Sequence, residues 1–243
     1  MNLLALETST EKLSIAIFRD GELFAREVDA GQRHSELALP LLHELLGEAT
    51  LKIRDVDAIA FGQGPGSFTG VRIACGLAQG LALGLGKSLV PVQTQMALAE
   101  QIGTHQVVVA IDARMGEIYI AAYRRDQAVA SGWRGLVAPI LVKPEALPTL
   151  DGQDWSAAGS GFDATAIGDQ LHARYGHQIS STVRGALPRA RDVALIAARQ
   201  LDTAGLASAI SPELAAPLYL RDNVAMTIDE RRKHHAAKAS VVS

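Results

Sequence analysis

One pattern occurs twice in this sequence of 243 residues: an apolar strand ending in an acid, a polar turn, a second apolar strand and an Arg-Asp turn. The first copy, LLALETSTEKLSIAIFRDGEL, starts at residue 3, and the second, VVVAIDARMGEIYIAAYRRDQAV, starts at residue 107. Similarity at a long period indicates a duplicated structural unit, and the length suffices for two lobes with proper cores. We therefore expect an N-terminal lobe over residues 1–105 and a C-terminal lobe over residues 106–222.

Hydrophobic periodicity predicts the elements of each lobe. In the N-terminal lobe we expect strands at 3–6, 13–18, 22–28, 56–61 and 88–92, and helices at 35–46, at 97–102 and in the second half of 62–86. Ser35 is the expected N-cap of the first helix and Gly47 its end, and Pro40 predicts a kink or a later start. In the C-terminal lobe we expect a strand at 155–159, a helix at 164–175, a helix at 190–203 that could pack back on the N-terminal lobe, and extended chain at 211–221. Residues 223–243 are expected to form a mobile tail.

Composition limits the compartment and the partners. The single cysteine, Cys75, excludes an internal disulfide framework and fits a reducing compartment; we interpret it as a core residue. A net charge of −3 gives no basic surface for nucleic acid. Glu7 interrupts the N-terminal segment too early for a signal peptide. The apolar run at 71–86 contains Arg72, Gln79 and four glycines, which is too broken for a membrane span. We expect a cytoplasmic protein with no membrane partner.

The segment GQGPGSFTGVRIACGLAQGLALGLG, residues 62–86, holds eight of the 22 glycines. Ser67 or Thr69 is the expected N-cap of its helix, on which Gly76, Gly80 and Gly84 are spaced by four and form one stripe. Each glycine inside a helix costs roughly 1 kcal/mol relative to alanine, and close approach of another backbone would offset that loss. The neighbour could be this chain's own sheet or first helix, or a helix of another protein.

A phosphate site is the alternative interpretation of this glycine-rich segment. A helix N-terminus after a glycine-rich turn suits an anion, but residues 62–66 match neither a Walker loop nor GxGxxG. The turns that start at Glu7 and Asp112 lack the glycines of a phosphate loop. For Asp112 and Arg114 we expect an acid and a base that tie the turn together. Arg72 lies near the positive end of the helix dipole, so we expect an acidic or phosphate partner for it.

Common catalytic arrangements are missing from the sequence. There is no GxSxG elbow, no HExxH and no paired-cysteine metal motif. His34 and His43 are interpreted as surface or packing residues, and His234 and His235 as solvated residues of the tail. The residues alone therefore favour a protein without its own metal or nucleophile.

The order of elements resembles the two-lobed actin-like superfamily, with its α/β, duplicated ribonuclease H-like (ASKHA) fold, in which ATP lies between the lobes. More specific segments carry a second resemblance. LALETST at 4–10, HSELALP at 34–40, GQGPGSFTGVRIACGLAQGLALGLGKSLVPV at 62–92, DARMGEIYIA at 112–121 and PLYLR at 217–221 identify the chain as similar to the TsaB (YeaZ) family, over most of its length and in the same order. The resemblance implies a degenerate actin-like fold.

The family's role gives the functional expectation. TsaB proteins resemble non-catalytic relatives of TsaD, pair with TsaD and are joined by the ATPase TsaE. Together they form the threonylcarbamoyl group on the adenosine beside the anticodon of tRNAs that read ANN codons. TsaD has two metal-binding histidines after the segment comparable to 80–92. The matching positions here are Thr94 and Leu98, neither of which can hold a metal as histidine does. The resemblance thus implies a scaffold without catalytic residues, metal or cofactor of its own, which meets tRNA only through the complex and forms a homodimer when TsaD is absent.

The family's docking helices match residues 35–46 and 69–85, and this match favours the external helix as the neighbour of the glycine stripe. The implied partner-binding residues are Ser35, Leu39, Leu42, Leu46, Gly70, Ile73, Gly76, Leu77, Gly80 and Gly84. ATP or ADP at the interface with TsaD is also implied, with Thr8, Ser9 and Arg72 as candidate contacts. The alternatives are an actin-like kinase or ATPase for small molecules, which the glycine-poor turns disfavour, a metalloprotease, which lacks ligands, and direct tRNA binding, which the negative charge disfavours.

Overall fold

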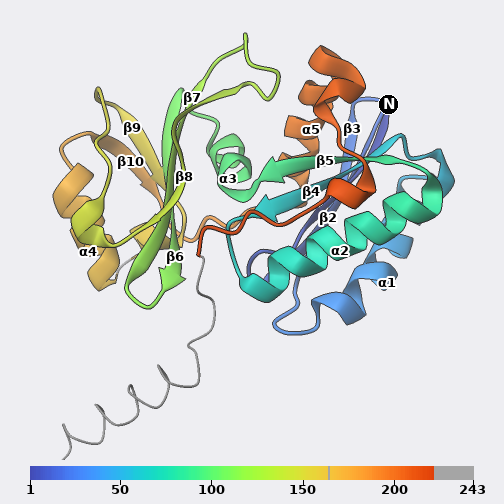
Figure 1. The fold of residues 1–243 in the computed structure, drawn as a ribbon, viewed down its shortest axis with the longest axis horizontal. Helices are drawn as coiled ribbons and strands as arrows, with labels where there is room; N and C mark the ends of the chain where they lie inside the picture. The colour runs from blue at the N-terminus through green and yellow to red at the C-terminus, as the bar shows by residue number, and fades with distance from the viewer. Residues whose placement is uncertain (164, 222–243) are drawn as a thin grey trace, which may run out of the picture.

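The computed structural model describes residues 1–163 and 165–221, and Figure 1 shows two lobes, each built on one mixed sheet. The expected tail at 223–243 and the expected helix start at residue 164 lie outside the described residues. The strand orders of the two sheets are β3-β2-β1-β4-β5 and β10-β9-β6-β7-β8. Because β6 to β10 follow one another in the same arrangement as β1 to β5, the duplication inferred from the repeated pattern is confirmed in the fold.

The N-terminal sheet begins with an antiparallel meander and adds two parallel strands. Its strands are β1 (Asn2–Glu7), β2 (Lys12–Arg19), β3 (Glu22–Asp29), β4 (Ala58–Gly64) and β5 (Ser88–Gln93). The turn at Asp20 and Gly21 has positive φ at both residues, which sets β2 against β3 in register from Arg19–Glu22 to Lys12–Asp29. β4 pairs parallel with β1 and with β5, so that the ends of β1 and β4 meet at one edge.

The C-terminal sheet repeats this plan with β6 (Gln106–Arg114), β7 (Glu117–Arg125), β8 (Trp133–Val142), β9 (Trp155–Ala158) and β10 (Ile179–Val183). β6, β7 and β8 are antiparallel, and β9 and β10 add in parallel. The two edge strands, β8 and β10, were not predicted. β8 contains glycine and proline and is only half-buried, and β10 is largely exposed, so neither shows a buried apolar pattern.

Helices cover both faces of the N-terminal sheet, as Figure 1 shows. α1 (His34–Glu48) and α2 (Phe68–Leu85) share one core with the face that carries Leu4, Leu6, Ile15 and Phe61. α5 (Ala190–Ala204) packs on the opposite face, against Leu3, Ala5 and Ala16. By length and composition α2 passes the test for a membrane span, but one side of it is buried in the protein.

The C-terminal sheet is covered by α4 (Ala166–Tyr175) on one face and by α3 (Thr94–Ile102) on the other. α3 follows β5 in the chain, yet Leu98 and Ala99 belong to the core of the C-terminal sheet. α5 belongs to the C-terminal half of the sequence but packs on the N-terminal sheet. The helix that follows each fifth strand therefore packs across the boundary between the lobes.

The expected N-cap of α1 was wrong, and of the two alternatives for Pro40 the later start was wrong. The residue at its N-cap is Arg33, which makes no side-chain capping bond, so that Ser35 lies inside the first turn. Pro40 lies within a helix that starts at His34 and runs to Glu48, so the helix does not begin later. Pro40 is the seventh residue of this helix, where a proline removes one amide hydrogen bond and its ring crowds the carbonyl four residues earlier. The packing of Leu41, Leu42 and Leu45 in the core accompanies the continuous helix.

Residues 209–221, here called the strap, run from α5 back along the N-terminal lobe and then to the C-terminal lobe (Figure 1). Ile210 exchanges two backbone hydrogen bonds with Leu89 on β5, of 2.8 and 2.9 Å. Leu218 N donates to Gln63 O at 2.8 Å, and the guanidinium of Arg221 donates to Ala113 O at 3.1 Å. The strap is largely extended, with a short 3-10 turn at Pro212–Leu214, and it connects the two lobes.

Candidate docking surface and interlobe cleft

Helix α2 has one face in the core and one face on the surface. Its N-cap is Ser67, whose hydroxyl accepts from Gly70 N at 3.4 Å, and it ends at Gly86 in the left-handed conformation. The buried face consists of Gly70, Val71, Ala74, Cys75, Ala78 and Ala82. The opposite face is exposed and consists of Thr69, Arg72, Gly76, Gly80, Leu83 and Gly84. Ile73 and Leu77 lie half-buried at its border.

The glycine stripe is open on this surface. A Cβ atom added to Gly76, Gly80 or Gly84 would meet no atom within 4 Å. Leu83, beside the stripe, is 55% exposed. Within residues 1–163 and 165–221, no backbone or side chain therefore makes the close approach that would offset the cost of three helical glycines.

The candidate docking residues of α1 divide into two groups. Ser35 is exposed, and Leu39, one turn later on the same helix, has 53% of its surface exposed. Leu46 is half-buried and packs at the border of the core. Leu42, in contrast, is 3% exposed and belongs to the core between α1 and the sheet. The folded chain leaves Leu42 no surface for a partner, which corrects the expectation that it lies on the docking face.

Gly70 also faces inward rather than toward a partner. The hydroxyl of Thr8 donates to Gly70 O at 2.7 Å, and a Cβ on Gly70 would overlap the carbonyl oxygen of Thr8. Gly70 thus serves close approach between α2 and the first turn of the same chain, which corrects its place among the docking residues. Thr8 is 1% exposed and its hydroxyl is engaged there, so it does not face a nucleotide.

Arg72 lies on the exposed face, one turn before Gly76. Its guanidinium carbon lies 3.3 Å from the centroid of the Phe68 ring and 5.1 Å from that of Tyr219 on the strap. The two rings are tilted by 39°, with centroids 6.0 Å apart. The acidic partner expected for Arg72 is not found among the described residues, where the guanidinium stacks on aromatic rings instead. Phe68 and Tyr219 were not predicted as surface residues, although Tyr219 belongs to the PLYLR segment that carries part of the family resemblance.

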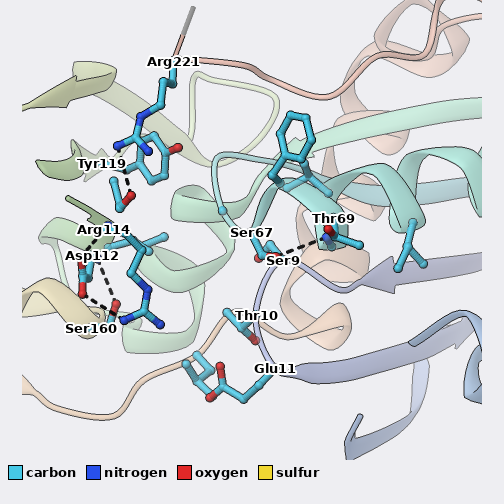
Figure 2. A pocket seen from close by; sticks show the side chains of 18 of the residues that line it. Ser9, Thr10, Glu11, Ser67, Thr69, Asp112, Arg114, Tyr119, Ser160 and Arg221 are labelled. Carbon is cyan, nitrogen blue, oxygen red and sulfur yellow. Dashed lines mark hydrogen bonds and ion pairs between the residues drawn. The ribbon is translucent and has the colours of Figure 1, made fainter. Parts of the chain in front are cut away.

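A cleft of about 1170 Å³ lies between the lobes. Figure 2 shows Ser9, Thr10 and Glu11 of the first turn facing Asp112, Arg114 and Ser160 of the C-terminal lobe across it. The start of α2 and the end of the strap also line the cleft. Its position between the first turns of two lobes matches the place where the resemblance expects nucleotide.

The first turn is organised around a buried acid. Glu7 is 1% exposed; its carboxylate accepts from Ser9 N at 2.6 Å and from the Thr94 hydroxyl at 3.3 Å. Burial raises the pKa of Glu7. Gly62 gives the carboxyl its space, because a Cβ there would overlap it. Ser9 is 3% exposed and lines the cleft, and its hydroxyl has no hydrogen-bond partner among the described residues. Contact of Ser9 with a nucleotide stays a prediction.

The second turn is held by its own charges, as predicted. The Asp112 carboxylate accepts from Arg114 N at 2.7 Å and lies 3.6 Å from the Arg114 guanidinium. Arg114, Met115 and Gly116 all have positive φ. Of these three residues only Gly116 is a glycine, so the turn lacks the run of glycines typical of a phosphate loop. The interaction of acid and base is therefore intramolecular.

The positions that match the TsaD histidines are buried. Thr94 and Leu98 are both 0% exposed. The Thr94 hydroxyl accepts from Gly64 N at 3.1 Å and donates to Glu7, so it joins the ends of β1, β4 and β5. Within the part of the chain that the structure describes, no group of three or more His, Cys, Asp or Glu side chains is placed to hold a metal ion.

Two sheets of equal strand order, with helices on both faces and a cleft between their first turns, define the duplicated actin-like class. Within that class the chain belongs to the TsaB (YeaZ) family. It is 38% identical to the tRNA threonylcarbamoyladenosine biosynthesis protein TsaB of Escherichia coli K12 over 236 residues, or 93% of this chain and 96% of the relative. It is 34% identical to TsaB of Bacillus subtilis over 128 residues, 51% of this chain and 56% of that protein.

The wider relation to TsaD is also visible. The model of the TsaD family, tRNA N6-adenosine threonylcarbamoyltransferase, matches residues 28–228. Among solved structures, YeaZ from Pseudomonas aeruginosa aligns with a TM-score of 0.78 and 34% identity, covering 90% of this chain and 99% of that one. A second structure from that organism, described as similar to peptidase YeaZ, has a TM-score of 0.80 at 34% identity, with 90% and 99% coverage. The resemblance stated from the sequence segments is thereby confirmed.

Proposed function

We propose that this chain acts in tRNA threonylcarbamoyladenosine biosynthesis as a non-catalytic subunit that docks on TsaD through α1 and α2. The curated relatives carry the name of this pathway, and the TsaD family model matches most of the chain. The enzyme partner would supply the catalytic groups and, with TsaE, the contact with tRNA. The proposed place of action is the cytoplasm.

The observation that carries the proposal is the open glycine stripe. Gly76, Gly80 and Gly84 lower the stability of α2 by roughly 1 kcal/mol each, and nothing in the described chain lies against them. Leu83 beside the stripe and Leu39 on α1 are further exposed apolar side chains of the two helices. A helix of another protein could approach α2 closely there and bury these side chains, as small residues permit at helix interfaces.

The test compares two glycine variants of the full-length protein. Gly80→Leu places a branched side chain on the stripe and should weaken binding of TsaD from the same organism by more than tenfold, measured by titration calorimetry. Gly135→Leu on β8, where an added Cβ also meets no atom within 4 Å, is the matched control and should bind normally. Normal binding by Gly80→Leu would place the interface elsewhere. Threonylcarbamoyladenosine formation in the reconstituted system should fall with binding.

The same face supports two further parts of the proposal. Without TsaD, two copies of the chain would pair through their α1–α2 faces, so added TsaD should convert the homodimer to a heterodimer in sedimentation experiments. ATP or ADP would bind where this chain meets TsaD, with Ser9 and Arg72 as the remaining candidate contacts from this side. Equilibrium dialysis of labelled ADP with each protein alone and with the complex tests this part.

The cleft between the lobes gives the alternative function a specific basis. A space of about 1170 Å³ is large enough for a nucleotide, as an actin-like kinase or ATPase for small molecules would require. Against it stand the buried Glu7 and the Asp112–Arg114 turn, which use their polar groups internally. ATP hydrolysis or phosphoryl transfer by the isolated chain, abolished by Ser9→Ala, would favour the alternative.

A further inference from the structure

The exposed face of α2 carries a single charge. Between Phe68 and Leu85, Arg72 is the only Asp, Glu, Lys or Arg in the sequence. It is the fifth residue of a helix of 18 residues, just past the first turn, near the positive end of the helix dipole. The N-terminal part of the docking face is therefore positive, and no acid of α2 itself balances it.

Among the described residues, the Arg72 guanidinium is held by aromatic rings and not through its hydrogen-bond donors. Its carbon lies 3.3 Å from the Phe68 ring centroid and 5.1 Å from that of Tyr219 on the strap, and because the two centroids are 6.0 Å apart, Tyr219 lies beside the guanidinium at about a right angle to Phe68. Stacking engages the flat face of the guanidinium and leaves the N–H groups at its edge available. In the described chain, Arg72 makes neither a hydrogen bond nor an ion pair, whereas Arg125 and Arg199 both bind Glu100.

The position of Arg72 relates it to the glycines. Arg72, Gly76, Gly80 and Gly84 are successive members of one i, i+4 row, so Arg72 stands at the N-terminal end of the open stripe. A backbone that packs along the three glycines passes next to Arg72 and removes water from it. A charge that loses water without gaining a partner opposes association strongly.

We propose that Arg72 determines partner specificity on this face, and that the docked protein places an Asp or Glu carboxylate against it. This inference rests on the proposed function. A carboxylate matches the guanidinium fork with two parallel hydrogen bonds, and it is also the group that the positive helix end favours. Phe68 and Tyr219 fix the fork before docking, so less side-chain freedom is lost when the pair forms. The strap thus helps to shape the docking face.

The test measures binding of TsaD to Arg72 variants of the full-length chain. Arg72→Gln keeps the length and polarity but removes the charge and the fork; its Kd should rise 10- to 100-fold, as for loss of a hydrogen bond to a charged group. Its affinity should also depend less on salt, because one ion pair is gone. Arg72→Lys should be intermediate. Arg174→Gln on α4, an exposed arginine near the Tyr175 ring, is the matched control and should bind within twofold of the wild type.

A charge swap identifies the partner's acid. Arg72→Glu should bind more weakly than Arg72→Gln, and one Asp→Arg or Glu→Arg substitution among the acids of TsaD should restore it. If Arg72→Gln binds within twofold of the wild type while Gly80→Leu does not bind, the docking face stands and this inference is overturned. If both variants bind normally, the proposed function falls with it.

Two other ligands for Arg72 are separated by the same titrations. If Arg72→Gln weakens binding only when ADP is present, the ligand is a phosphate and the carboxylate is ruled out. A full-length variant with Asp222→Asn, Asp229→Asn and Glu230→Gln should bind TsaD normally. If that triple variant instead reproduces the loss, and combining it with Arg72→Gln adds nothing, the acid belongs to this chain and the inference also fails.

Discussion

Helices α2 and α4 hold the same place in the two lobes, since each connects the fourth and fifth strands of its repeat, β4 to β5 and β9 to β10. Their first turns are built alike. Ser67 caps α2 by accepting from Gly70 N, and Thr165 caps α4 by accepting from Gly168 N. In both helices a Cβ on that glycine would overlap a carbonyl oxygen, of Thr8 in one case and of Asp163 in the other. The capping bond and the inward glycine thus occur in both lobes, although Thr8 belongs to the first turn of its lobe and Asp163 directly precedes α4.

The outer faces of the same two helices differ. α4 exposes Asp169, Gln170, Ala173 and Arg174, as expected of a helix that faces water. α2 is longer, with 18 residues against 10, and exposes three glycines and Leu83 with Arg72 as its single charge. Because the inner construction is shared, the outer difference does not come from the fold, which is why we relate it to docking.

The largest expected effect tests the shared construction. Gly70→Ala would drive a methyl into the Thr8 carbonyl oxygen and should lower the free energy of unfolding by about 3 kcal/mol, as overpacking against main chain does. Gly168→Ala should cost a similar amount in the C-terminal lobe. Urea unfolding followed by circular dichroism measures both. A cost below about 1 kcal/mol for one variant alone would break the equivalence of the two helix starts.

The helices that follow the fifth strands extend the comparison to buried acids. On α3, the Glu100 carboxylate accepts from Trp133 at 2.7 Å, Arg125 at 2.9 Å and Arg199 of α5 at 2.6 and 3.1 Å. Burial by itself raises the pKa of Glu100, but these donors outweigh it and the pKa is lowered. On α5, burial raises the pKa of Asp192 to about 6 despite its contact with Arg189. Both carboxyl groups lie on helices that pack across the lobe boundary, yet the protein lowers the pKa of Glu100 and raises that of Asp192.

Opposite pH dependences follow for the two acids. A lowered pKa means that ionised Glu100 stabilises the fold above its ordinary value of 4.5, and that this stability is lost as pH falls through the folded pKa. Glu100→Gln should therefore cost about 1–3 kcal/mol at pH 7, and less below pH ~4. Asp192 contributes most below its ordinary value of 3.8 and loses that contribution as pH rises toward about 6.

Relative to the wild type, Asp192→Asn should then become more stable between pH 4 and 6, by on the order of 1–3 kcal/mol. Urea unfolding at pH steps from 3.5 to 7.5 gives both curves. Arg54→Gln, whose partner Asp55 lies on the surface, serves as the control and should change little with pH in this range. If the stabilities of Glu100→Gln and Asp192→Asn relative to the wild type change in the same direction as the pH rises, the contrast between the two helices is contradicted.

Local patterns were sufficient for much of the fold. The repeated strand–turn–strand pattern predicted β1, β2, β6 and β7, because these strands are buried and nearly continuously apolar. Ser67 was one of the two caps predicted for α2, and the Asp112–Arg114 interaction was predicted from neighbouring residues. In each case the determining interaction spans a few positions, so a single sequence contains it.

What was not predicted depends on contacts between distant residues. The inward role of Gly70 comes from Thr8, 62 positions earlier, and the Glu100 network joins Arg199, 99 positions later. Leu42 and Leu39 have the same character in the sequence, and only the packing of α1 on the sheet places Leu42 in the core and Leu39 outside. Spacing of glycines likewise predicts a close approach but not which chain makes it.

The smallest expected effect addresses that last question. A Cβ on Gly76, Gly80 or Gly84 meets nothing, so each Gly→Ala variant should stabilise the isolated chain by about 0.5–1 kcal/mol through helix propensity. If a foreign helix uses the stripe, the same methyl should weaken TsaD binding, and stability and affinity should move in opposite directions. Ala173→Gly on the exposed face of α4 is the converse control: it should lower stability by a similar amount and leave binding unchanged.

Unfolding at protein concentrations well below the homodimer Kd separates the two quantities, because association otherwise adds to the stability of the wild type. If the alanine variants are more stable and bind TsaD with unchanged affinity, the glycines of α2 are not needed for binding. The difference between α2 and α4 would then need another origin than docking. A loss of affinity that grows from one alanine to three, against rising stability, is expected only if the glycines are kept for an approaching backbone.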